Sequence, residues 1–393
     1  MSSDWDQARN VLCIRLDYLG DVLMTTPALR ALRESVPGRS LTLLTSSSGA
    51  AVARYIPEID DTILYAPPWM KSSPVYDADY QLEMMQTLRQ RNFDAAVIFT
   101  AYSQSPLPTA MLCHLARIPL RLAHCHENPY QMLTDWILDP EPTQGIRHEV
   151  RRQLDLVASV GCYAENEHLS FVVREEDLTW VRQRLRASGA DNDKPWVLLH
   201  PGATAISRRY PAEHWAQVIA DLHAELGVNL LLTGDVGEAD LANAIIAASG
   251  VEAPSVVSLA GELDLGQLGA AIKLASVVVS NNTGPAHLAA AIGTPLVDLY
   301  ALTNPQHTPW QVESRVLFHD VPCRFCYKSI CPKGHGHCLS KVEPVRVVAA
   351  VQSLLQRMPG TWQLPPLDII SSIGHTITTP LASVDMKPAT RVF

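Results

Sequence analysis

The sequence predicts an α/β protein built from two doubly wound domains. Short apolar runs alternate with segments of helical spacing, which is typical of parallel strands joined by helices. The alternation occurs in two blocks, separated by a charged and mostly helical stretch at residues 144–190. Hydrophobic residues make up 47% of the chain and charged residues 18%, as in an ordinary globular protein. We therefore expect two sheets that face one another across a cleft, where ligands of such folds bind.

The first block opens with an apolar strand at residues 11–16, followed by a loop and a segment of helical spacing. Pro27 lies within that segment and predicts a fresh helix start, because proline fits the first turn of a helix better than its interior. The other elements expected in this block are strands at 40–45, 60–65 and 93–100 and a helix at 76–91.

The second block opens with a strand at residues 196–200. A helix is expected to follow, with Pro211 at its first position and Gly227 as its end. The remaining elements expected are strands at 228–234, 274–280 and 295–300 and helices at 237–249, 285–293 and 343–358. Residues 359–393 are rich in Pro, Thr and Ser without periodicity, which predicts an extended or disordered tail.

Charge and hydropathy exclude two classes of function. The chain has 31 basic and 40 acidic residues, a net charge of −9, which is unlike the basic balance of a nucleic-acid-binding protein. No apolar run reaches the roughly 18 residues that a membrane span needs. The start of the chain, MSSDWDQARN, is too polar and acidic for a signal peptide. We therefore expect a cytoplasmic protein.

Small polar residues at 280–284 follow a buried strand and precede a helix. Pro285 suits the first helical position, with Thr283 or Gly284 as the cap. The free N–H groups and partial positive charge of that helix start suit a diphosphate, and His287 in the first turn could add a hydrogen bond. The alternative is a capped turn in which His287 only packs.

Asp21 occupies the equivalent place in the first block, just after Gly20 and the strand at 11–16. Its carboxylate could cap the helix that follows, which is the commonest role of aspartate at such a position. It could instead face the cleft as a general base, with Asp17 as a rival candidate.

Three segments together resemble glycosyltransferase family 9, the ADP-heptose:lipopolysaccharide heptosyltransferases. They are IRLDYLGDVLMTTPALRALRESVP, HPGATAISRRYPAEHWAQVI and VVVSNNTGPAHLAAAIGTPLVDLY, in the family's order. The resemblance implies the GT-B fold, with two Rossmann-like domains, and inversion at the anomeric carbon without a catalytic metal or other cofactor. The organisation expected is an acceptor-binding domain at 1–185, a nucleotide-sugar-binding domain at 186–342, a C-terminal helix at 343–358 and the tail at 359–393.

The resemblance also assigns chemistry to individual residues. Asp21 matches the family's catalytic base, and Arg208 falls where the family places a basic side chain against the donor phosphates. The residues that it implies for donor binding are Thr204, Glu238, Asn282, Thr283, Gly284 and His287. The family commonly has Asp in place of Asn282, and an uncharged amide there leaves the identity of the donor sugar open.

The implied enzyme moves heptose from ADP-heptose to the inner core of lipopolysaccharide. Its expected partners are a nucleotide sugar and a lipid-linked saccharide, with at most peripheral contact at the inner face of the inner membrane. The alternatives are a protein O-heptosyltransferase, a nucleotide-sugar-binding protein without transferase activity, and a sugar-nucleotide epimerase of the same fold.

Four cysteines cluster in CRFCYKSICPKGHGHC with a C-x2-C-x4-C-x6-C spacing. Thiols so close together in a reducing compartment favour a metal over disulfides, and we expect a structural zinc or iron ion. The expected ligands are Cys323, Cys326, Cys331 and Cys338, with His335 and His337 as possible substitutes. The alternative is a loop of free thiols.

Overall fold

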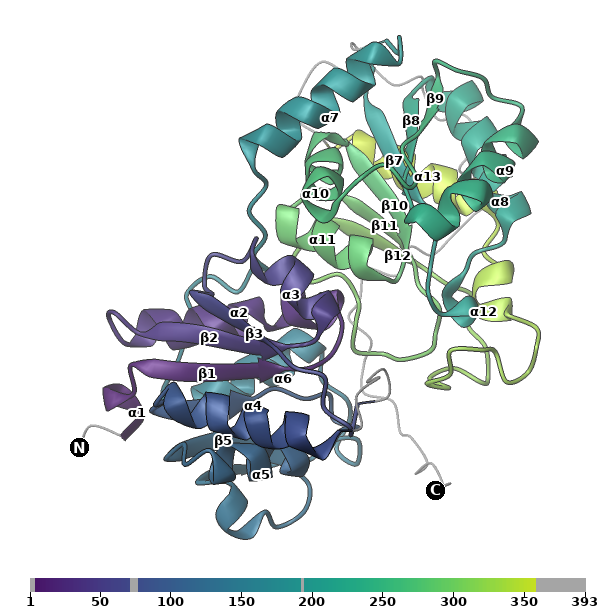
Figure 1. Ribbon diagram of the computed structural model, residues 1–393. Coiled ribbons are helices and arrows are strands. Elements are labelled where there is room, and N and C mark those ends of the chain that lie inside the picture. Colours follow the sequence, from purple (N-terminus) through teal and green to yellow (C-terminus); the bar gives the residue numbers. More distant parts are fainter. Residues whose placement is uncertain (1–3, 71–76, 192–193, 358–393) are drawn as a thin grey trace. The chain divides into compact units, whose positions relative to one another are not determined.

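The computed structural model describes residues 4–70, 77–191 and 194–357, and the predicted tail at 359–393 lies outside them. The chain divides into two compact units between Val172 and Val173. Within the described residues, each unit holds one six-stranded sheet with helices packed on both faces (Figure 1). The prediction of an α/β protein with two doubly wound sheets is confirmed.

The sheet of unit 1 has the strand order β3-β2-β1-β4-β5-β6, and all neighbours are parallel. Helices α2, α3 and α6 lie on one face, and α4 and α5 on the other (Figure 1). The strands are β1 (Asn10–Arg15), β2 (Ser40–Thr45), β3 (Asp61–Leu64), β4 (Ala95–Ile98), β5 (Leu120–Cys125) and β6 (Asp135–Leu138). The helices are α1 (Asp4–Gln7), α2 (Leu19–Ser35), α3 (Ser47–Ala53), α4 (Ala78–Gln90), α5 (Leu107–Leu115), η1 (Tyr130–Met132) and α6 (Glu149–Ala158).

The sheet of unit 2 repeats this order as β12-β11-β10-β7-β8-β9, again with parallel neighbours. Helices α8, α9 and α13 pack together on one face, and α7, α10 and α11 on the other (Figure 1). The strands are β7 (Trp196–His200), β8 (Asn229–Leu232), β9 (Val256–Ser258), β10 (Val277–Asn281), β11 (Leu296–Leu299) and β12 (Ser314–Leu317). The helices are α7 (Glu175–Ala187), η2 (Ile206–Arg208), α8 (Ala212–Asp221), η3 (Leu222–Leu226), η4 (Val236–Glu238), α9 (Ala239–Ser249), α10 (Leu265–Leu274), α11 (Gly284–Ile292), α12 (His337–Ser340) and α13 (Pro344–Leu355).

Continuous apolar runs form the central strands because helices remove both faces of each sheet from water. In β1, every residue from Val11 to Arg15 is buried, and in β7 every residue from Trp196 to His200 is buried. A charged side chain within such a run needs partners, and Arg15, at the carboxyl end of β1, finds them in the site described below.

Pro27 does not begin a helix: it lies inside α2. A proline in a helix interior leaves the carbonyl four residues earlier without its usual N–H donor. Here that carbonyl belongs to Leu23, and the Thr26 hydroxyl donates to it at 2.7 Å. The prediction of a fresh helix start at Pro27 was wrong because a neighbouring side chain replaces the missing backbone donor.

Candidate functional site

Unit 1 carries a polar cluster at the point where its strand order reverses. Loops from β1 and β4 leave the sheet toward opposite faces there, which opens the crevice that ligands of doubly wound sheets use. The two loops are tied together by side chains, since Gln104 Nε2 donates to Asp17 Oδ1 at 2.6 Å. Gln104 Oε1 accepts from the backbone N–H of Ala101 at 3.0 Å, which fixes the amide in its own loop.

Arg15 holds three carboxylates at this crevice. Its Nε lies 2.9 Å from Asp17 Oδ2, and its Nη2 lies 3.2 Å from Asp21 Oδ1. Its Nη1 donates to Glu149 Oε1 at 2.8 Å, and the Gln153 amide donates to the same oxygen at 2.7 Å. Burial alone would lower the pKa of Arg15, but the three carboxylates raise it above the ordinary value. One cation therefore faces three acidic groups.

Asp21 takes the first of the two roles that the sequence left open, the helix cap, and pairs with Arg15 as well. Its Oδ2 accepts from the backbone N–H of Tyr18 at 3.2 Å, so the carboxylate caps the start of α2. The other oxygen, Oδ1, pairs with Arg15. The side chain still keeps 18% of its surface exposed.

Asp17, the rival candidate, is held more tightly. Arg15 and Gln104 each contact one of its carboxylate oxygens, and its side chain is 13% exposed. Burial raises the pKa of the Asp17 carboxyl above its ordinary value against the opposing effect of Arg15, and the charge of Asp21 adds to the rise. The two aspartates thus share one guanidinium, and the Asp21 side chain is the more exposed of the two.

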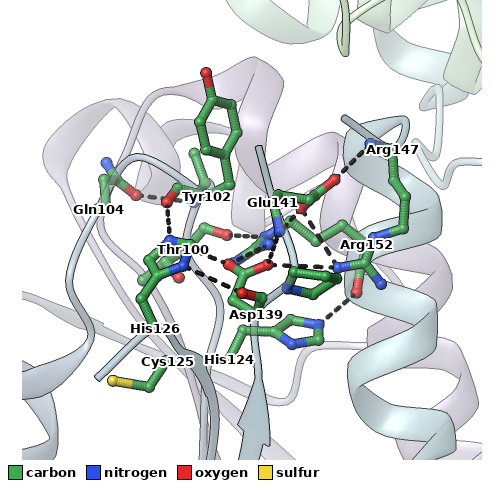
Figure 2. Close-up of polar contacts among 12 residues, drawn as sticks. Thr100, Tyr102, Gln104, His124, Cys125, His126, Asp139, Glu141, Arg147 and Arg152 are labelled. Carbon is green, nitrogen blue, oxygen red and sulfur yellow. Dashed lines mark hydrogen bonds and ion pairs between the residues drawn. The ribbon is translucent and has the colours of Figure 1, made fainter. Parts of the chain in front are cut away.

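A second polar network lies beside this crevice, beyond the ends of β5 and β6 (Figure 2). Asp139 and Glu141 are buried and both contact Arg152 Nη1, at 2.7 Å in the case of Asp139. His126 lies on the solvent side of the network. Its Nε2 is 2.7 Å from the Tyr102 carbonyl oxygen, and its Nδ1 is 3.3 Å from the Asp139 carbonyl oxygen. The imidazole is therefore held in one orientation.

His124 lies on the buried side of the same network (Figure 2). Its Nε2 is 3.2 Å from the Arg152 carbonyl oxygen. Burial, together with the nearby charges of Arg152 and Arg147, lowers the pKa of His124 to about 4. The imidazole is therefore neutral at neutral pH, and of the two histidines around Cys125 only His126 reaches solvent.

Unit 2 has a corresponding site where its own strand order reverses, between β7 and β10. The Asn281 amide joins the two loops, because its Nδ2 donates to the carbonyls of Pro201 and Gly202 at 2.8 and 3.2 Å. Its Oδ1 accepts from the backbone N–H of Tyr210 at 3.2 Å. Both ends of the loop that carries Arg208 are thereby fixed against β10.

The start of α11 lies at this crevice. The helix begins at Gly284 with Thr283 as its N-cap and Pro285 in the first turn, as the sequence predicts. The Thr283 hydroxyl bonds no backbone N–H of the helix. Pro285 has no N–H, and the Ala286 N–H donates to the Thr283 carbonyl oxygen at 3.1 Å, so this helix start offers an anion the Gly284 N–H and the positive end of the helix dipole. Arg208 Nη1 donates to the carbonyl oxygen of Asn282 at 3.3 Å, so a guanidinium lies next to this helix start.

Arg209, the neighbour of Arg208, points to its own loop, where its Nε donates to the Ala203 carbonyl oxygen at 2.8 Å. Thr204 is exposed on that loop. His287 is buried, and its ring lies edge-on to that of His307 with centroids 6.3 Å apart. The packing alternative for His287 is therefore realised at least in part.

Glu238 reaches the same crevice from the loop after β8. Its Oε2 accepts from the Asp235 N–H at 3.0 Å and lies 3.8 Å from His200 Nε2. Burial raises the pKa of Glu238. A Cβ atom at Gly202 would fall 2.1 Å from this carboxylate, so only glycine allows the close approach.

The four clustered cysteines do not form the predicted metal site. Among the residues that the structure describes, no three His, Cys, Asp or Glu side chains form a group that could hold a metal ion. Cys323 Sγ lies 3.7 Å from His335 Nε2. Burial alone would raise the pKa of Cys331, but backbone N–H groups of residues 333–336 lower it below its ordinary value. The loop backbone, rather than a tetrahedral ligand set, satisfies this thiol.

Comparison with known proteins decides the family. The family model described as glycosyltransferase family 9 (heptosyltransferase) matches residues 81–337, well over half of the chain. The chain belongs to glycosyltransferase family 9. It is therefore a glycosyltransferase, and the resemblance that the sequence motifs carried is confirmed. Lipopolysaccharide heptosyltransferase 2 of Escherichia coli K12 is 24% identical to this family 9 chain over 356 residues, 88% of this chain and 98% of the relative.

Solved structures share the fold of this family 9 chain. The glycosyltransferase family 9 structure from Veillonella parvula superposes with a TM-score of 0.76 at 22% identity, covering 91% of this chain and 99% of the other. The structure of E. coli ADP-heptose LPS heptosyltransferase II gives a TM-score of 0.68 at 22% identity over 88% and 99% of the two chains. The GT-B fold is confirmed by these likenesses.

Within each unit of the family 9 chain, most of the predicted site residues lie at the same end of the sheet. In unit 2 the predicted donor-site residues lie in the segments after β7 and β8 and in the turn and first turn of α11 after β10, and in unit 1 Asp21 lies beside Asp17 and Arg15. Sequence reasoning missed Gln104 and the network around Arg152. The one signal for that network was the His-Cys-His triplet at the end of β5.

Among the described helices, none combines the length and apolar character needed to cross a bilayer.

Proposed function

We propose that this family 9 enzyme is an inverting heptosyltransferase that moves heptose from ADP-heptose to the inner core of lipopolysaccharide. The observation that carries the proposal is the start of α11 beside Arg208, a cationic cradle at the switch point of unit 2, which suits a diphosphate leaving group. Related chains are named lipopolysaccharide heptosyltransferases, and one solved relative is named for ADP-heptose.

In the proposed reaction, an acceptor hydroxyl attacks the anomeric carbon from the face opposite the diphosphate. A new C–O bond forms as the bond from that carbon to the β-phosphate oxygen breaks, and the electron pair stays on the leaving ADP. By analogy with inverting glycosidases, a carboxylate takes the hydroxyl proton, and we assign this to Asp21, the more exposed of the two aspartates. No metal ion is required by this scheme.

The leaving diphosphate needs charge neutralisation rather than a proton. Arg208, the Gly284 N–H and the positive end of the α11 dipole can supply it, because all three are in place before the reaction begins. The other residues that we assign to the donor are Thr204, Glu238, Asn282, Thr283, Gly284 and His287. We assign donor binding to unit 2 and acceptor binding to unit 1.

A donor and acceptor screen by mass spectrometry tests the proposal. Purified protein is incubated with a panel of nucleotide sugars and with Kdo-lipid A or a hydroxyl-bearing peptide. We expect ADP-heptose to be consumed, ADP to be released, and the lipid-linked acceptor to gain one heptose residue. Transfer only to the peptide would favour protein O-heptosylation, and a changed sugar without release of ADP would favour an epimerase. If every donor is left intact, the proposal is wrong.

Because the acceptor is lipid-linked, we place the reaction at the inner face of the inner membrane.

A further inference from the structure

A cavity of about 160 Å³ lies beside the crevice of unit 1, between the loops that follow β4 and β5. Cys125 and Pro106 supply its apolar part. Its polar lining consists of Tyr102, Ser103, Gln104, Ser105, His126 and Glu127. Figure 2 shows Gln104, Tyr102 and His126 at this end of the sheet, beside the Asp139 network. None of these residues belongs to the assignments made above.

The lining is suited to hydroxyl groups. Gln104, Ser103 and Ser105 offer both donors and acceptors, and Glu127 offers acceptors. The lining contains no lysine or arginine, and its one formal charge is the carboxylate of Glu127. The Arg15 cluster adds to this, because Gln104 contacts Asp17, where Arg15 faces three acidic groups. In the cluster behind His126, the carboxylates of Asp139 and Glu141 are instead paired with Arg147 and Arg152. A phosphate or carboxylate group would meet like charge here.

Two of the lining side chains are fixed before any ligand arrives. Gln104 is held by Asp17 on one side and by the Ala101 N–H on the other, yet its amide keeps a further N–H. The two ring nitrogens of His126 face the Tyr102 and Asp139 carbonyl oxygens, and the neutral ring donates to one of them; Asp139 beneath it pairs with Arg152. Polar groups that are held in place lose little conformational entropy on binding, which favours a small polar ligand.

The size of the cavity limits the ligand. Pockets for drug-sized molecules measure about 300–1,000 Å³, so a cavity of about 160 Å³ suits a single sugar ring. We propose that this cavity binds one neutral, hydroxyl-bearing sugar unit of the acceptor, and that it disfavours a sugar carrying a phosphate or carboxylate. Kdo carries a carboxylate, so the unit that enters the cavity is a neutral core sugar other than Kdo. The inference rests on the proposed function, since it concerns the acceptor. Gln104 then links the bound ring to the Asp17–Asp21 pair.

Direct binding tests the cavity without any transfer reaction. Saturation-transfer NMR on the full-length protein compares methyl α-mannopyranoside with mannose 6-phosphate as probes. We expect the neutral sugar to bind and the phosphorylated sugar to bind at least about tenfold more weakly, the equivalent of one hydrogen bond or like-charge contact. The Gln104→Ala variant should weaken the neutral sugar about fivefold to tenfold, because it removes one hydrogen-bonding group.

A charge reversal gives a sharper test. Glu127→Lys should bring the affinities for the two probes together or invert them, because the cavity gains a cation. Glu165→Lys is the matched control: it makes the same charge change at an exposed residue of unit 1 outside the cavity lining, and should keep the preference for the neutral sugar.

Three outcomes would overturn the inference: equal or tighter binding of mannose 6-phosphate by the unaltered protein, no binding of either probe, or an identical effect of Glu127→Lys and Glu165→Lys. Failure of the transferase proposal looks different. In that case the unaltered protein consumes no nucleotide sugar in the donor screen, whatever the probes do in the NMR experiment.

Discussion

Gln104 donates a hydrogen bond of 2.6 Å to Asp17 across the point where the strand order of unit 1 reverses. This contact joins the loop after β4 to the carboxylate cluster after β1. It also places the cavity lined by Gln104 next to Asp17 and, through Arg15, to Asp21. The acceptor pocket and the base that we propose therefore belong to one hydrogen-bonded assembly.

We predict that Asp21→Asn retains ADP binding but lowers the rate of transfer by about 10²–10⁴, as expected for loss of a general base. An asparagine oxygen can still accept the Tyr18 N–H, so the start of α2 is preserved. Transfer is measured by release of ADP, and ADP affinity by calorimetry. Asp79→Asn, an exposed aspartate in the first turn of α4, is the control and should leave both unchanged. A turnover within threefold of the unaltered enzyme would rule out Asp21 as the base.

We predict that Arg208→Ala lowers kcat by about 10²–10³, because the leaving diphosphate loses a fixed donor. Arg209→Ala should lower it much less, since that side chain bonds its own loop at the Ala203 carbonyl. Initial rates over a range of donor concentrations separate kcat from KM. Equal losses in the two variants would contradict the role given to Arg208.

We predict that Arg152→Leu lowers the free energy of unfolding by about 3–5 kcal/mol, because Asp139 and Glu141 lose the buried cation that contacts both. The neighbouring Arg151→Leu should cost at most about 1 kcal/mol, since the pair of Arg151 with Glu167 is partly exposed. Urea unfolding at neutral pH measures both. Similar losses would show that the network around Arg152 contributes no more than a surface pair.

We predict that His124 makes the protein less stable in acid. Its pKa is about 4 in the folded chain and 6.5 ordinarily, so the unfolded chain binds the proton first as the pH falls. The contribution of neutral His124 to the free energy of unfolding is fully present above pH 6.5 and is lost as the pH falls toward 4. The free energy of unfolding should fall by about 2 kcal/mol between pH 7 and pH 5. His124→Gln should remove that part of the decline in urea unfolding at the two pH values. His114→Gln, at an exposed position, should not.

We predict that Asp298→Asn stabilises unit 2 increasingly as the pH rises. Asp298 is fully buried, and within the described residues neither of its carboxylate oxygens has a hydrogen-bond partner. Burial raises its pKa well above the ordinary value, against the opposing effect of Arg208. The folded chain thus holds this proton longer than the unfolded chain, and stability declines above the ordinary pKa. Unfolding at pH 4 and pH 8 measures the effect. Asp320→Asn, at an exposed site, is the control, and a stabilisation independent of pH would contradict the prediction.

Most inner strands and the edge strand β3 could be predicted from the sequence, whereas the inner strand β5 and the edge strands β6, β9 and β12 could not. Buried strands such as β1 and β10 are continuous apolar runs, but β6 alternates between exposed and half-buried residues and is only four residues long. Pro27 misled because the replacement donor, the Thr26 hydroxyl, becomes evident only from its geometry. Sequence patterns report on residues that are close along the chain. The unpredicted edge strands and the helix around Pro27 depend instead on contacts made in the folded structure.

The residues of the candidate site also differ in whether the sequence could predict their positions. Asp21 and the start of α11 follow strands directly, so their positions could be predicted from local order and from the family resemblance. Gln104 and Asp17 are 87 residues apart, and no local pattern relates them. The cysteines show the opposite error, since close spacing in sequence suggested ligands that the described structure does not assemble.

In each unit a carboxamide side chain joins the two loops at the base of the crevice by hydrogen bonds. It is Gln104 in unit 1 and Asn281 in unit 2. A carboxamide neither gains nor loses a proton in the range where proteins stay folded. In unit 2 the Asn281 amide bonds backbone carbonyls, so protonation of Glu238 leaves that link between the loops unchanged. In unit 1 the link ends on a carboxylate, so protonation of Asp17 would change a group that also joins the two loops.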